Sequence, residues 1–417
     1  MSRTGTISIT DEPKGRSKKE CFDGNSVTVL SRSGLHPVER VALERFRNAL
    51  PSPRNLLVAG NRTGVTAMFA RRLFPECRVT SHAFDLHHVR AIARNIAANG
   101  YASRFFADEG VRVFDAECLE QGDGADAVRL ACTAYLPPAE DATGYDAAVL
   151  LYTPGLMTAE LLLDQLEDIH ARLAPGGRLL LVAETPQDAL LKQLKAMYAH
   201  FTLLVSSSKR SPLCVLCEKR GELAKPRDFH ASFTTSVPGQ AEPLTLISLP
   251  GVFCHRRADA GGLALAEVAT DLLKNQGDAP RVKNLLDMGC GCGLVGLLIA
   301  ANVPVGHLAF LDSHARALEA AKRNAAALGV TNVSFTLSDN GAPQRGYDLF
   351  VGNPPYYSEY RIADIFLEGA HGALRRGGSC LTVAKAAGAL ARRQEEVFGN
   401  VLSIPRRGYT VLKSTRS

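Results

Sequence analysis

The string Asn353-Pro354-Pro355-Tyr356 combines residue types that could do chemistry on a planar amino group. An aromatic or amide NH2 is a poor nucleophile because its lone pair is delocalised, so a catalyst has to hold the group in a reactive geometry. The side-chain oxygen of Asn353 and the backbone carbonyl of Pro354 can accept its two N–H bonds and direct the lone pair at an electrophile. Tyr356 can stack on the attached ring. The alternative is that the two prolines form only a rigid turn.

A glycine-rich loop earlier in the chain has the features of an adenosine-binding turn. Gly289, Gly291 and Gly293 lie between an apolar strand expected at 284–286 and an apolar helix expected at 294–301. Glycine lets the backbone pass close to a ligand, and a helix N-terminus offers unpaired N–H groups. The spacing G-x-G-x-G departs from the dinucleotide fingerprint and favours S-adenosylmethionine (SAM) over a nicotinamide cofactor. A tight turn that binds no ligand is the alternative.

Three aspartates at the ends of apolar strands complete the expected adenosine site. Asp287 opens the glycine loop, Asp312 ends the next strand, and Asp339 follows a strand expected at 333–337. Ligands of parallel α/β sheets bind at the carboxyl ends of the strands. There Asp312 can accept both hydroxyls of a ribose, and Asp339 is placed to meet an adenine amino group. The sequence therefore predicts SAM as the cofactor and methyl transfer to an amino group as the reaction.

In-line positioning and the dispersal of the sulfonium charge can supply the rate enhancement, and no general base is required before transfer. Among the ten cysteines, Cys214 and Cys217 have zinc-like spacing, and Cys254-His255 is a conceivable second pair. The alternating apolar pattern around the first pair is typical of a strand. We therefore expect buried, reduced thiols and no metal ion.

The two halves of the chain repeat the same order of elements, which indicates the scaffold behind these residues. Residues 55–64 correspond to 284–293, and in each case an apolar strand enters a glycine turn. Three further pairs follow in the same order: 83–85 with 310–312, 144–149 with 346–351, and 175–183 with 376–384. Strands that alternate with helical patterns form parallel sheets covered by helices. The predicted fold is α/β, with two tandem doubly wound, Rossmann-like domains.

The expected division of the chain has three parts. Residues 1–27 are polar and basic and are predicted to be a flexible tail. Residues 28–222 and 223–417 are the two predicted domains, because periodicity weakens in the polar, proline-containing stretch at 220–250.

The N-terminal copy has lost the residues that could do chemistry. The string 151–154 reads Leu-Tyr-Thr-Pro where the C-terminal copy has 353–356, and Val58 stands where Asp287 does. We therefore expect the N-terminal domain to neither bind SAM well nor catalyse, and to serve recognition or support.

The composition is that of a protein that builds sizeable cores. Of the 417 residues, 46% are hydrophobic and 22% are charged, with a net charge of +6. No apolar run approaches the roughly 18 to 20 residues that a membrane span needs. We expect a cytoplasmic protein without a membrane partner, whose modest positive charge is compatible with binding phosphates.

These motifs together resemble those of the bacterial ribosomal RNA small-subunit guanine-N2 methyltransferases. That class I, SAM-dependent family has tandem methyltransferase-like domains, of which only the second is active. The similarity covers the C-terminal half and, more weakly, the N-terminal half. The resemblance implies that the target guanine is held by 353–356 and that SAM is bound by Asp287, Gly289, Gly291, Gly293, Asp312 and Asp339. Phe253 and Asp259 fall in a segment that looks like the one that folds over the cofactor in this family.

The implied enzyme transfers a methyl group to an exocyclic amino group of ribosomal RNA, at guanine N2 of the small subunit. Ribosomal RNA or the small ribosomal subunit is its implied partner, and we expect a monomer. Two departures from the family pattern leave the target base open, namely Cys254 in place of serine and Tyr356-Tyr357 in place of phenylalanine and its neighbour. An N-P-P-Y string is also similar to that of adenine-N6 and protein glutamine-N5 methyltransferases. A non-catalytic RNA-binding protein is a third possibility.

Overall fold

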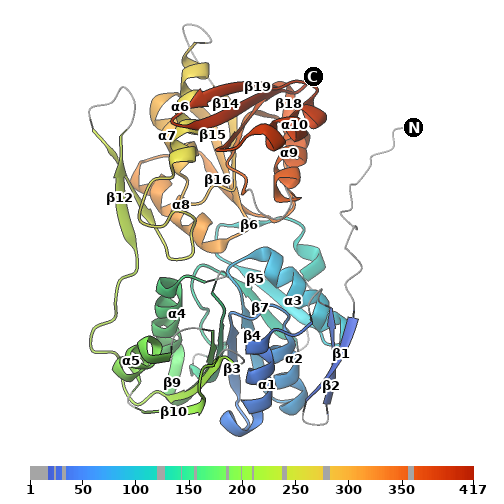
Figure 1. The fold of residues 1–417 in the computed structure, drawn as a ribbon, viewed down its shortest axis with the longest axis vertical. Helices are drawn as coiled ribbons and strands as arrows, with labels where there is room; N and C mark the ends of the chain where they lie inside the picture. The colour runs from blue at the N-terminus through green and yellow to red at the C-terminus, as the bar shows by residue number, and fades with distance from the viewer. Residues whose placement is uncertain are drawn as a thin grey trace.

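Two α/β halves follow one another in the chain and meet at the end of each sheet, as the computed structural model shows (Figure 1). The structure describes residues 17–22, 25–30, 34–119, 127–141, 143–154, 157–184, 187–198, 200–208, 211–236, 242–275, 282–355 and 361–417. Each half is built on a sheet of eight strands, and a two-stranded sheet precedes each of them along the chain.

The N-terminal half begins with a hairpin and continues as alternating strands and helices. Its elements are β1 (Ser17–Phe22), β2 (Asn25–Leu30), α1 (Pro37–Ala49), β3 (Asn55–Ala59), α2 (Val65–Leu73), β4 (Arg78–His82), α3 (Leu86–Ala98), β5 (Ser103–Ala107), β6 (Arg112–Val113), a 3-10 helix (Ala116–Leu119), β7 (Val128–Cys132), β8 (Tyr145–Tyr152), α4 (Ala159–Arg172), β9 (Leu173–Ala183), α5 (Gln187–Met197), β10 (His200–Val205) and β11 (Leu213–Glu218).

The C-terminal half repeats this plan. Its elements are β12 (Ala231–Thr235), β13 (Leu244–Ser248), α6 (Ala260–Lys274), β14 (Val282–Met288), α7 (Leu294–Asn302), β15 (Val305–Asp312), α8 (Ala315–Ala327), β16 (Val333–Leu337), β17 (Tyr347–Gly352), α9 (Arg361–Ala373), β18 (Leu374–Ala384), α10 (Gly388–Phe398), β19 (Leu402–Arg406) and β20 (Tyr409–Thr415).

The order of strands confirms the predicted fold class. The C-terminal sheet runs β19-β20-β18-β17-β14-β15-β16-β6, with β14 to β18 parallel and β20 antiparallel to β18. The N-terminal sheet runs β10-β11-β9-β8-β3-β4-β7-β5 and has the same arrangement up to its last strand. The central strands are apolar and buried because helices cover both faces of a parallel sheet. Both halves are therefore doubly wound.

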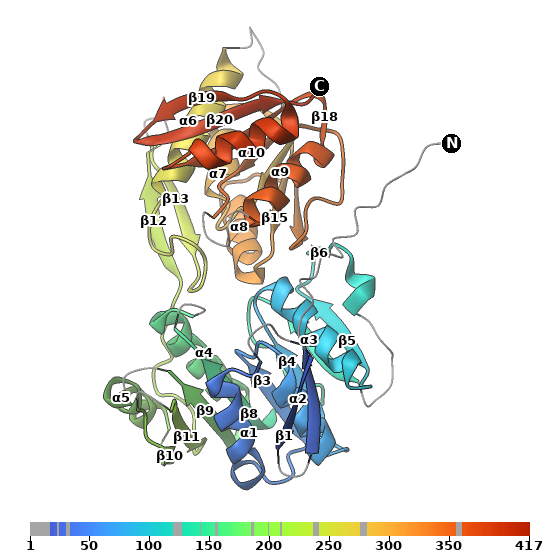
Figure 2. The ribbon, with the colours of Figure 1, turned by 45° about the vertical axis from the view of Figure 1, so that its right-hand side comes forward.

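One strand crosses from one half to the other. β6 lies in the stretch between β5 and β7, yet it pairs in parallel with β16, through Thr336 with Arg112 and Leu337 with Val113. Figure 2 shows β6 at the level where the two halves meet, above α3 and β5. Phe114 extends this pairing by donating its N–H to the carbonyl of Leu337 at 3.0 Å. The unpaired groups of β16 are thus satisfied by the other half. The division at residue 222, which stays a prediction, assigns β6 to the domain that it leaves.

The hairpins are part of the repeat that the sequence comparison did not find. Asn95 in α3 accepts the N–H of Leu30 at 2.6 Å, and Asn324 in α8 accepts the N–H of Ile247 at 2.8 Å. Each asparagine also donates to the carbonyl of the residue whose N–H it accepts. Each hairpin is therefore fastened by a helical asparagine at the same place in its half.

The structure differs from the predicted flexible tail at 1–27 over its last part. Residues 17–22 form β1, which pairs with β2, and the β-branched residues Val27, Thr28 and Val29 favour that strand. Asn99 accepts the N–H of Thr28 at 2.8 Å and holds the hairpin against α3. Residues 1–16 lie outside the described residues.

The loops that follow β4 and β15 join the two halves. Leu86 donates its N–H to the carbonyl of Ser313 at 2.8 Å, and Ala315 donates to the carbonyl of Phe84 at 2.7 Å. Arg316 beside them is only 1% exposed, forms an ion pair with Asp164 and lies 4.4 Å from the centroid of the Phe84 ring. Because equivalent loops of the two sheets meet, the carboxyl end of the C-terminal sheet faces the N-terminal half.

Two smaller expectations concern cysteines and membranes. Cys214 and Cys217 lie in β11, as their pattern predicted, and they pack into different core clusters because residues three apart point to opposite faces of a strand. They therefore cannot share one metal ion.

Within the described residues, no helix is both long and apolar enough to cross a membrane.

Candidate active site

Three positions of the loop between β14 and α7 have a backbone conformation that favours glycine. Gly289, Gly291 and Gly293 have φ angles of 67°, 55° and 84°. A Cβ on Gly289 would also lie 2.6 Å from Cζ of Phe366. Other residues are strained in this left-handed region, which explains the glycine spacing. The turn ends at α7, whose first N–H groups therefore face the carboxyl edge of the sheet.

Asp287 fixes the turn from inside the protein. Its side chain is 2% exposed, and Oδ2 accepts the N–H of Gly296 in α7 at 2.9 Å. Burial raises the pKa of Asp287 to about 7. The carboxylate thus ties β14 to the helix that starts the loop, and a direct contact with SAM stays a prediction.

Asp312 lies at the opposite side of the same loop. Its Oδ2 accepts the N–H of Gly291 at 3.0 Å, and Oδ1 accepts the N–H of His314 at 2.9 Å. The residue is half-buried, and burial raises the pKa of the carboxyl to about 6. Two oxygens that each accept one backbone N–H keep lone pairs for further donors. The position fits the predicted bonds to ribose hydroxyls.

Asp339 follows β16 and is in contact with the N-terminal half. Its Oδ1 accepts from Nε of Arg90 in α3 at 2.8 Å, and Oδ2 lies 3.7 Å from Nδ1 of His87. Burial by itself would raise the pKa of Asp339, but His87 and Arg90 outweigh burial and lower it. Arg90 also donates to the carbonyls of Phe114 at 2.7 Å and Asp115 at 3.0 Å, directly after β6. Contact with adenine stays a prediction for Asp339.

Arg90 is the residue near this site that sequence reasoning missed. It is 9% exposed and belongs to a helix of the half that was expected to serve recognition or support. In the sequence it is one arginine of an amphipathic helix, and no local pattern distinguishes it from its exposed neighbours. The pairing of β6 with β16 and the bond from Leu86, at the start of the same helix, to Ser313 bring it to Asp339.

Asn353 follows β17 at the same edge of the sheet as the glycine loop. In the parallel pairing of β14 with β17, Met288 lies opposite Gly352, so Gly289 and Asn353 are the next residues on adjacent strands. The side-chain Nδ2 of Asn353 donates to Oδ2 of Asp259 at 2.8 Å. Pro354 is buried and Pro355 is half-buried. The predicted motif is therefore adjacent to the predicted cofactor loop.

Part of the predicted motif cannot be placed. Tyr356, expected to stack on the target base, lies outside the described residues, as does Tyr357. The roles of Asn353, Pro354 and Pro355 in catalysis stay predictions.

The segment before α6 lies next to the glycine loop. Val252 faces Gly291, since a Cβ on this glycine would lie 4.0 Å from Cγ1 of Val252. Phe253 is 69% exposed, and Cys254 directly after it has a φ of 53°. Asp259, predicted with Phe253 to contact SAM, caps α6 by accepting the N–H of Gly262 at 2.7 Å. The contact of either side chain with the cofactor stays a prediction.

The thiols of the loop are not nucleophiles. Cys290 and Cys292 are both buried. Burial raises the pKa of Cys292 to about 12 and that of Cys290 well above its usual value. Protonated thiols of this kind act as small packing residues, as their place in the turn predicted.

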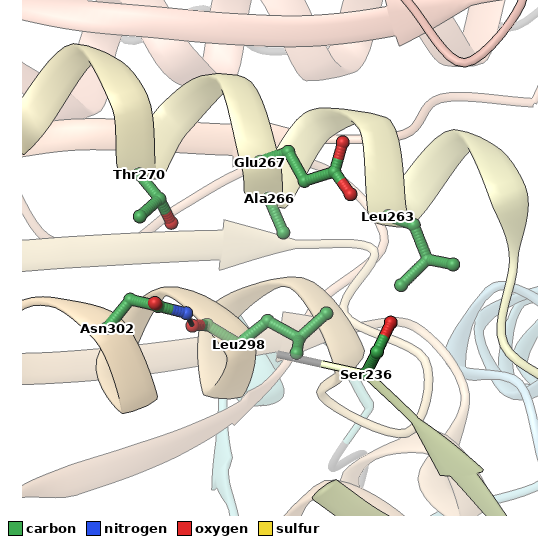
Figure 3. A pocket seen from close by; sticks show the side chains of 7 residues that line it. All are labelled: Ser236, Leu263, Ala266, Glu267, Thr270, Leu298 and Asn302. Carbon is green, nitrogen blue, oxygen red and sulfur yellow. Dashed lines mark hydrogen bonds between the residues drawn. The ribbon is translucent and has the colours of Figure 1, made fainter. Parts of the chain in front are cut away.

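A separate pocket lies along α6 and α7 (Figure 3). It is lined by Ser236, Leu263, Ala266, Glu267, Thr270, Leu298 and Asn302. None of these residues belongs to the predicted site, and Glu267 forms ion pairs with Arg406 and Arg407. The pocket is therefore a feature of helix packing and is separate from the edge that carries Asn353.

Known proteins resemble the chain over both halves. Residues 243–413 match the family model of the methyltransferase small domain. The ribosomal RNA small subunit methyltransferase C of Pseudomonas paraeruginosa is 32% identical to the chain, over 58% of this chain and 70% of that protein. The chain belongs to the family of ribosomal RNA small-subunit methyltransferases.

A large-subunit enzyme is also similar to this methyltransferase. The ribosomal RNA large subunit methyltransferase G of Pseudomonas aeruginosa is 30% identical, over 74% of each chain. Among solved structures, the 16S rRNA N2 G1207 methyltransferase of T. Thermophilus, in complex with AdoMet and guanosine, matches with a TM-score of 0.69 and 18% identity. The match covers 97% of this chain and 99% of that one. It confirms the tandem fold.

This methyltransferase is a SAM-dependent enzyme, and its loop fits that cofactor. Among the described residues, Val252 alone would come within 4 Å of a Cβ placed on Gly291, so these residues leave room for a ligand beside the backbone there. SAM supplies an activated methyl group on a sulfonium. Asp312 and the N–H groups at the start of α7 are the groups that would hold it next to Asn353.

Proposed function

We propose that this enzyme methylates the N2 amino group of a guanine in small-subunit ribosomal RNA. The observation that carries the proposal is the adjacency of Asn353 to the glycine loop, on paired strands of one sheet edge. The names of its small-subunit relatives support ribosomal RNA as the substrate, and the guanosine in the T. Thermophilus enzyme supports the base. We further propose that the protein acts as a monomer in the cytoplasm, on RNA or on the small subunit.

Positioning is the proposed mechanism. Oδ1 of Asn353 and the carbonyl of Pro354 accept the two N–H bonds of the guanine amino group, so that its lone pair points at the methyl group. The proton that the product loses after transfer can leave to water, because no base is needed before the bond forms. Tyr356 stacks on the guanine ring in this proposal.

The N-terminal half is proposed to bind RNA and to support the site. Seven arginines lie between residues 40 and 72. Of these, Arg71 is 8% exposed and donates to the carbonyls of Pro75 and Cys77, so it holds the turn after α2 instead of contacting phosphates. The others are exposed or half-buried, and we propose them as phosphate contacts: Arg40, Arg45, Arg47, Arg54, Arg62 and Arg72.

One labelling experiment tests the substrate. The protein is incubated with methyl-labelled SAM and, separately, naked 16S RNA, naked 23S RNA, both ribosomal subunits, DNA and a release factor, all from cells that lack the modification. We expect label in small-subunit RNA, which nucleoside analysis assigns to N2-methylguanosine. Label in 23S RNA alone would favour the large-subunit reaction that the second relative suggests. Label in N6-methyladenosine or glutamine would contradict the proposal.

A further inference from the structure

We propose that Asp259 is a positioning residue that determines which end of the Asn353 amide faces the substrate. The proposal goes beyond the expectation that Asp259 contacts SAM, and it rests on the role proposed for Asn353. It starts from one contact, the 2.8 Å hydrogen bond from Nδ2 of Asn353 to Oδ2 of Asp259.

The chemistry of this contact selects one amide orientation. An ionised carboxylate accepts hydrogen bonds and cannot donate one, so it favours the NH2 end of an amide and disfavours the oxygen end. With Nδ2 turned to Asp259, Oδ1 of Asn353 points away from the carboxylate. The reaction requires this orientation, because the target amino group presents N–H bonds and needs acceptors.

The carboxylate is itself held in place by α6. Oδ2 of Asp259 also accepts the N–H of Gly262 at 2.7 Å, which makes Asp259 the N-cap of the helix. Its Oδ1 lies 3.6 Å from Sγ of Cys254, which donates to it. The N-terminus of a helix favours a negative charge. Oδ2 of Asp259 therefore both caps the N-terminus of α6 and orients the side chain of Asn353.

Helix packing links this cap to the cofactor loop. A Cβ on Gly262 would lie 3.3 Å from Leu294 and 3.4 Å from Val295, so the first turns of α6 and α7 are in close contact. Further along, Leu263 and Ala266 of α6 face Leu298 of α7 (Figure 3). Asp259 is thereby held at a fixed place relative to the start of α7, where SAM is bound.

Three variants at this position separate the cap from the orientation. Asp259→Ser keeps an N-cap oxygen, but the shorter side chain does not reach Asn353. Asp259→Asn can keep both bonds through its one amide oxygen, because both bonds use Oδ2. Asp259→Ala loses both. Thr158→Ala is the matched control, since it removes the N-cap oxygen of α4, which accepts the N–H of Leu161 at 3.1 Å, without touching Asn353.

We expect Asp259→Ser to leave the thermal midpoint unchanged and the SAM dissociation constant within about twofold of wild type. Its kcat on the RNA substrate should fall about 10- to 100-fold. Asp259→Asn should retain most of kcat. Asp259→Ala and Thr158→Ala should both lower the midpoint, and only the former should lower kcat. Wild-type kcat in Asp259→Ser, or weakened SAM binding with kcat unchanged, would overturn the proposal.

A second measurement does not depend on the RNA substrate. In protein labelled with 15N at asparagine, the side-chain NH2 of Asn353, assigned through Asn353→Asp, should exchange slowly with solvent in wild type and in Asp259→Asn. It should exchange at least about tenfold faster in Asp259→Ser, because the N–H is no longer hydrogen-bonded. Equal exchange in wild type and Asp259→Ser would contradict the proposal. A wild-type protein that methylates no RNA but shows the slow exchange would contradict only the proposed function.

Discussion

The two halves share one scaffold, yet the turn after the first central strand is built differently in each. In the C-terminal half, Asp287 holds α7 through Gly296, and the small side chain of Cys290 lies buried in the glycine loop. In the N-terminal half, Val58 stands at the place of Asp287 and Asn61 occupies the turn, where it is 3% exposed. Asn61 accepts the N–H of Gly64 at 2.6 Å and donates to Oγ of Ser81 at 2.9 Å. The corresponding N–H in the C-terminal half, that of Gly293, is held by the backbone carbonyl of Cys290 at 2.8 Å, so in the N-terminal half a side chain has replaced a backbone group inside the turn.

The acidic strand ends show the same change. Asp312 points at the glycine loop, whereas its counterpart Asp85 accepts the N–H of His87 at 2.9 Å and the hydroxyl of Ser313 at 3.0 Å. A residue type that we propose to bind the cofactor in one copy contacts the other copy in the second, where Asp85 accepts from Ser313. The comparison teaches that loss of a site can coincide with gain of an interface, with the fold unchanged.

The largest expected effect comes from Asn353 and its counterpart. Asn353→Ala should lower kcat by at least about 100- to 1000-fold, because the target amino group loses an acceptor that positions it. SAM affinity, measured by calorimetry, should stay within about twofold. Leu151→Met changes the equivalent N-terminal position and should leave the chemical step unaffected. Parallel loss of SAM binding in Asn353→Ala would mean that the motif is structural.

The next effect tests whether the N-terminal half takes part in the cofactor site. Arg90 and Asp339 have side chains that are 10% and 11% exposed, so Arg90→Ala leaves a buried carboxylate without its main partner. We expect a loss of about 3–5 kcal/mol in unfolding free energy and weaker SAM binding. Arg104→Ala breaks an exposed pair with Glu140 in the same half and should cost no more than about 1 kcal/mol. Unchanged SAM affinity in Arg90→Ala would mean that Arg90 only holds the two halves together and does not contribute to SAM binding.

A pH titration distinguishes Asp312 from Asp85. Burial raises the pKa of Asp312 to about 6, and a ribose hydroxyl donates to the ionised form, so SAM affinity should rise about tenfold between pH 5 and pH 7. The stability of the protein without SAM should change in the opposite direction and fall over the same pH range. The raised pKa values of Asp312 and Asp287 mean that the folded state keeps protons that the unfolded chain has lost, so their contribution to stability falls from about pH 4 to about pH 7. Asp85→Asn should keep the rise in affinity and move it only toward lower pH, because the charge of Asp85 contributes to the raised pKa of Asp312. A flat wild-type profile would contradict this role of Asp312.

The smallest effect compares the two asparagines that fasten the hairpins. Asn95 and Asn324 are each 1% exposed, and either change to alanine should cost about 1–3 kcal/mol of unfolding free energy, measured by urea denaturation. Asn324 also donates to the carbonyl of Cys292 in the glycine loop at 2.9 Å. Asn324→Ala should therefore weaken SAM binding as well, while Asn95→Ala should not. Equal SAM affinity in both variants would show that the loop does not need this bond.

The sequence predicted most of what depends on local pattern. The glycine turn, the strand ends at Asp287 and Asp312, and the motif at Asn353 all follow from residue types at fixed spacing, and the structure places them on neighbouring strands. Contacts between segments far apart in the chain could not be predicted from local patterns. β6 has only two residues and no periodicity, and Arg90 has no distinguishing neighbours, so neither could be assigned to the C-terminal site. Asp259 was found, but as a cofactor contact, because sequence cannot show that its oxygen reaches Asn353.

The strand that crosses between the halves has a consequence for biosynthesis. A chain is made from its N-terminus, so β6 has left the ribosome before the first strand of the second sheet is made. β6, the edge strand that pairs with β16, is thus already made when β16 is synthesised. The edge of β16 need not stay unpaired, where a second nascent chain on the same message could pair with it. A C-terminal fragment expressed alone would lack β6, so its β16 edge would be unpaired from the moment of synthesis.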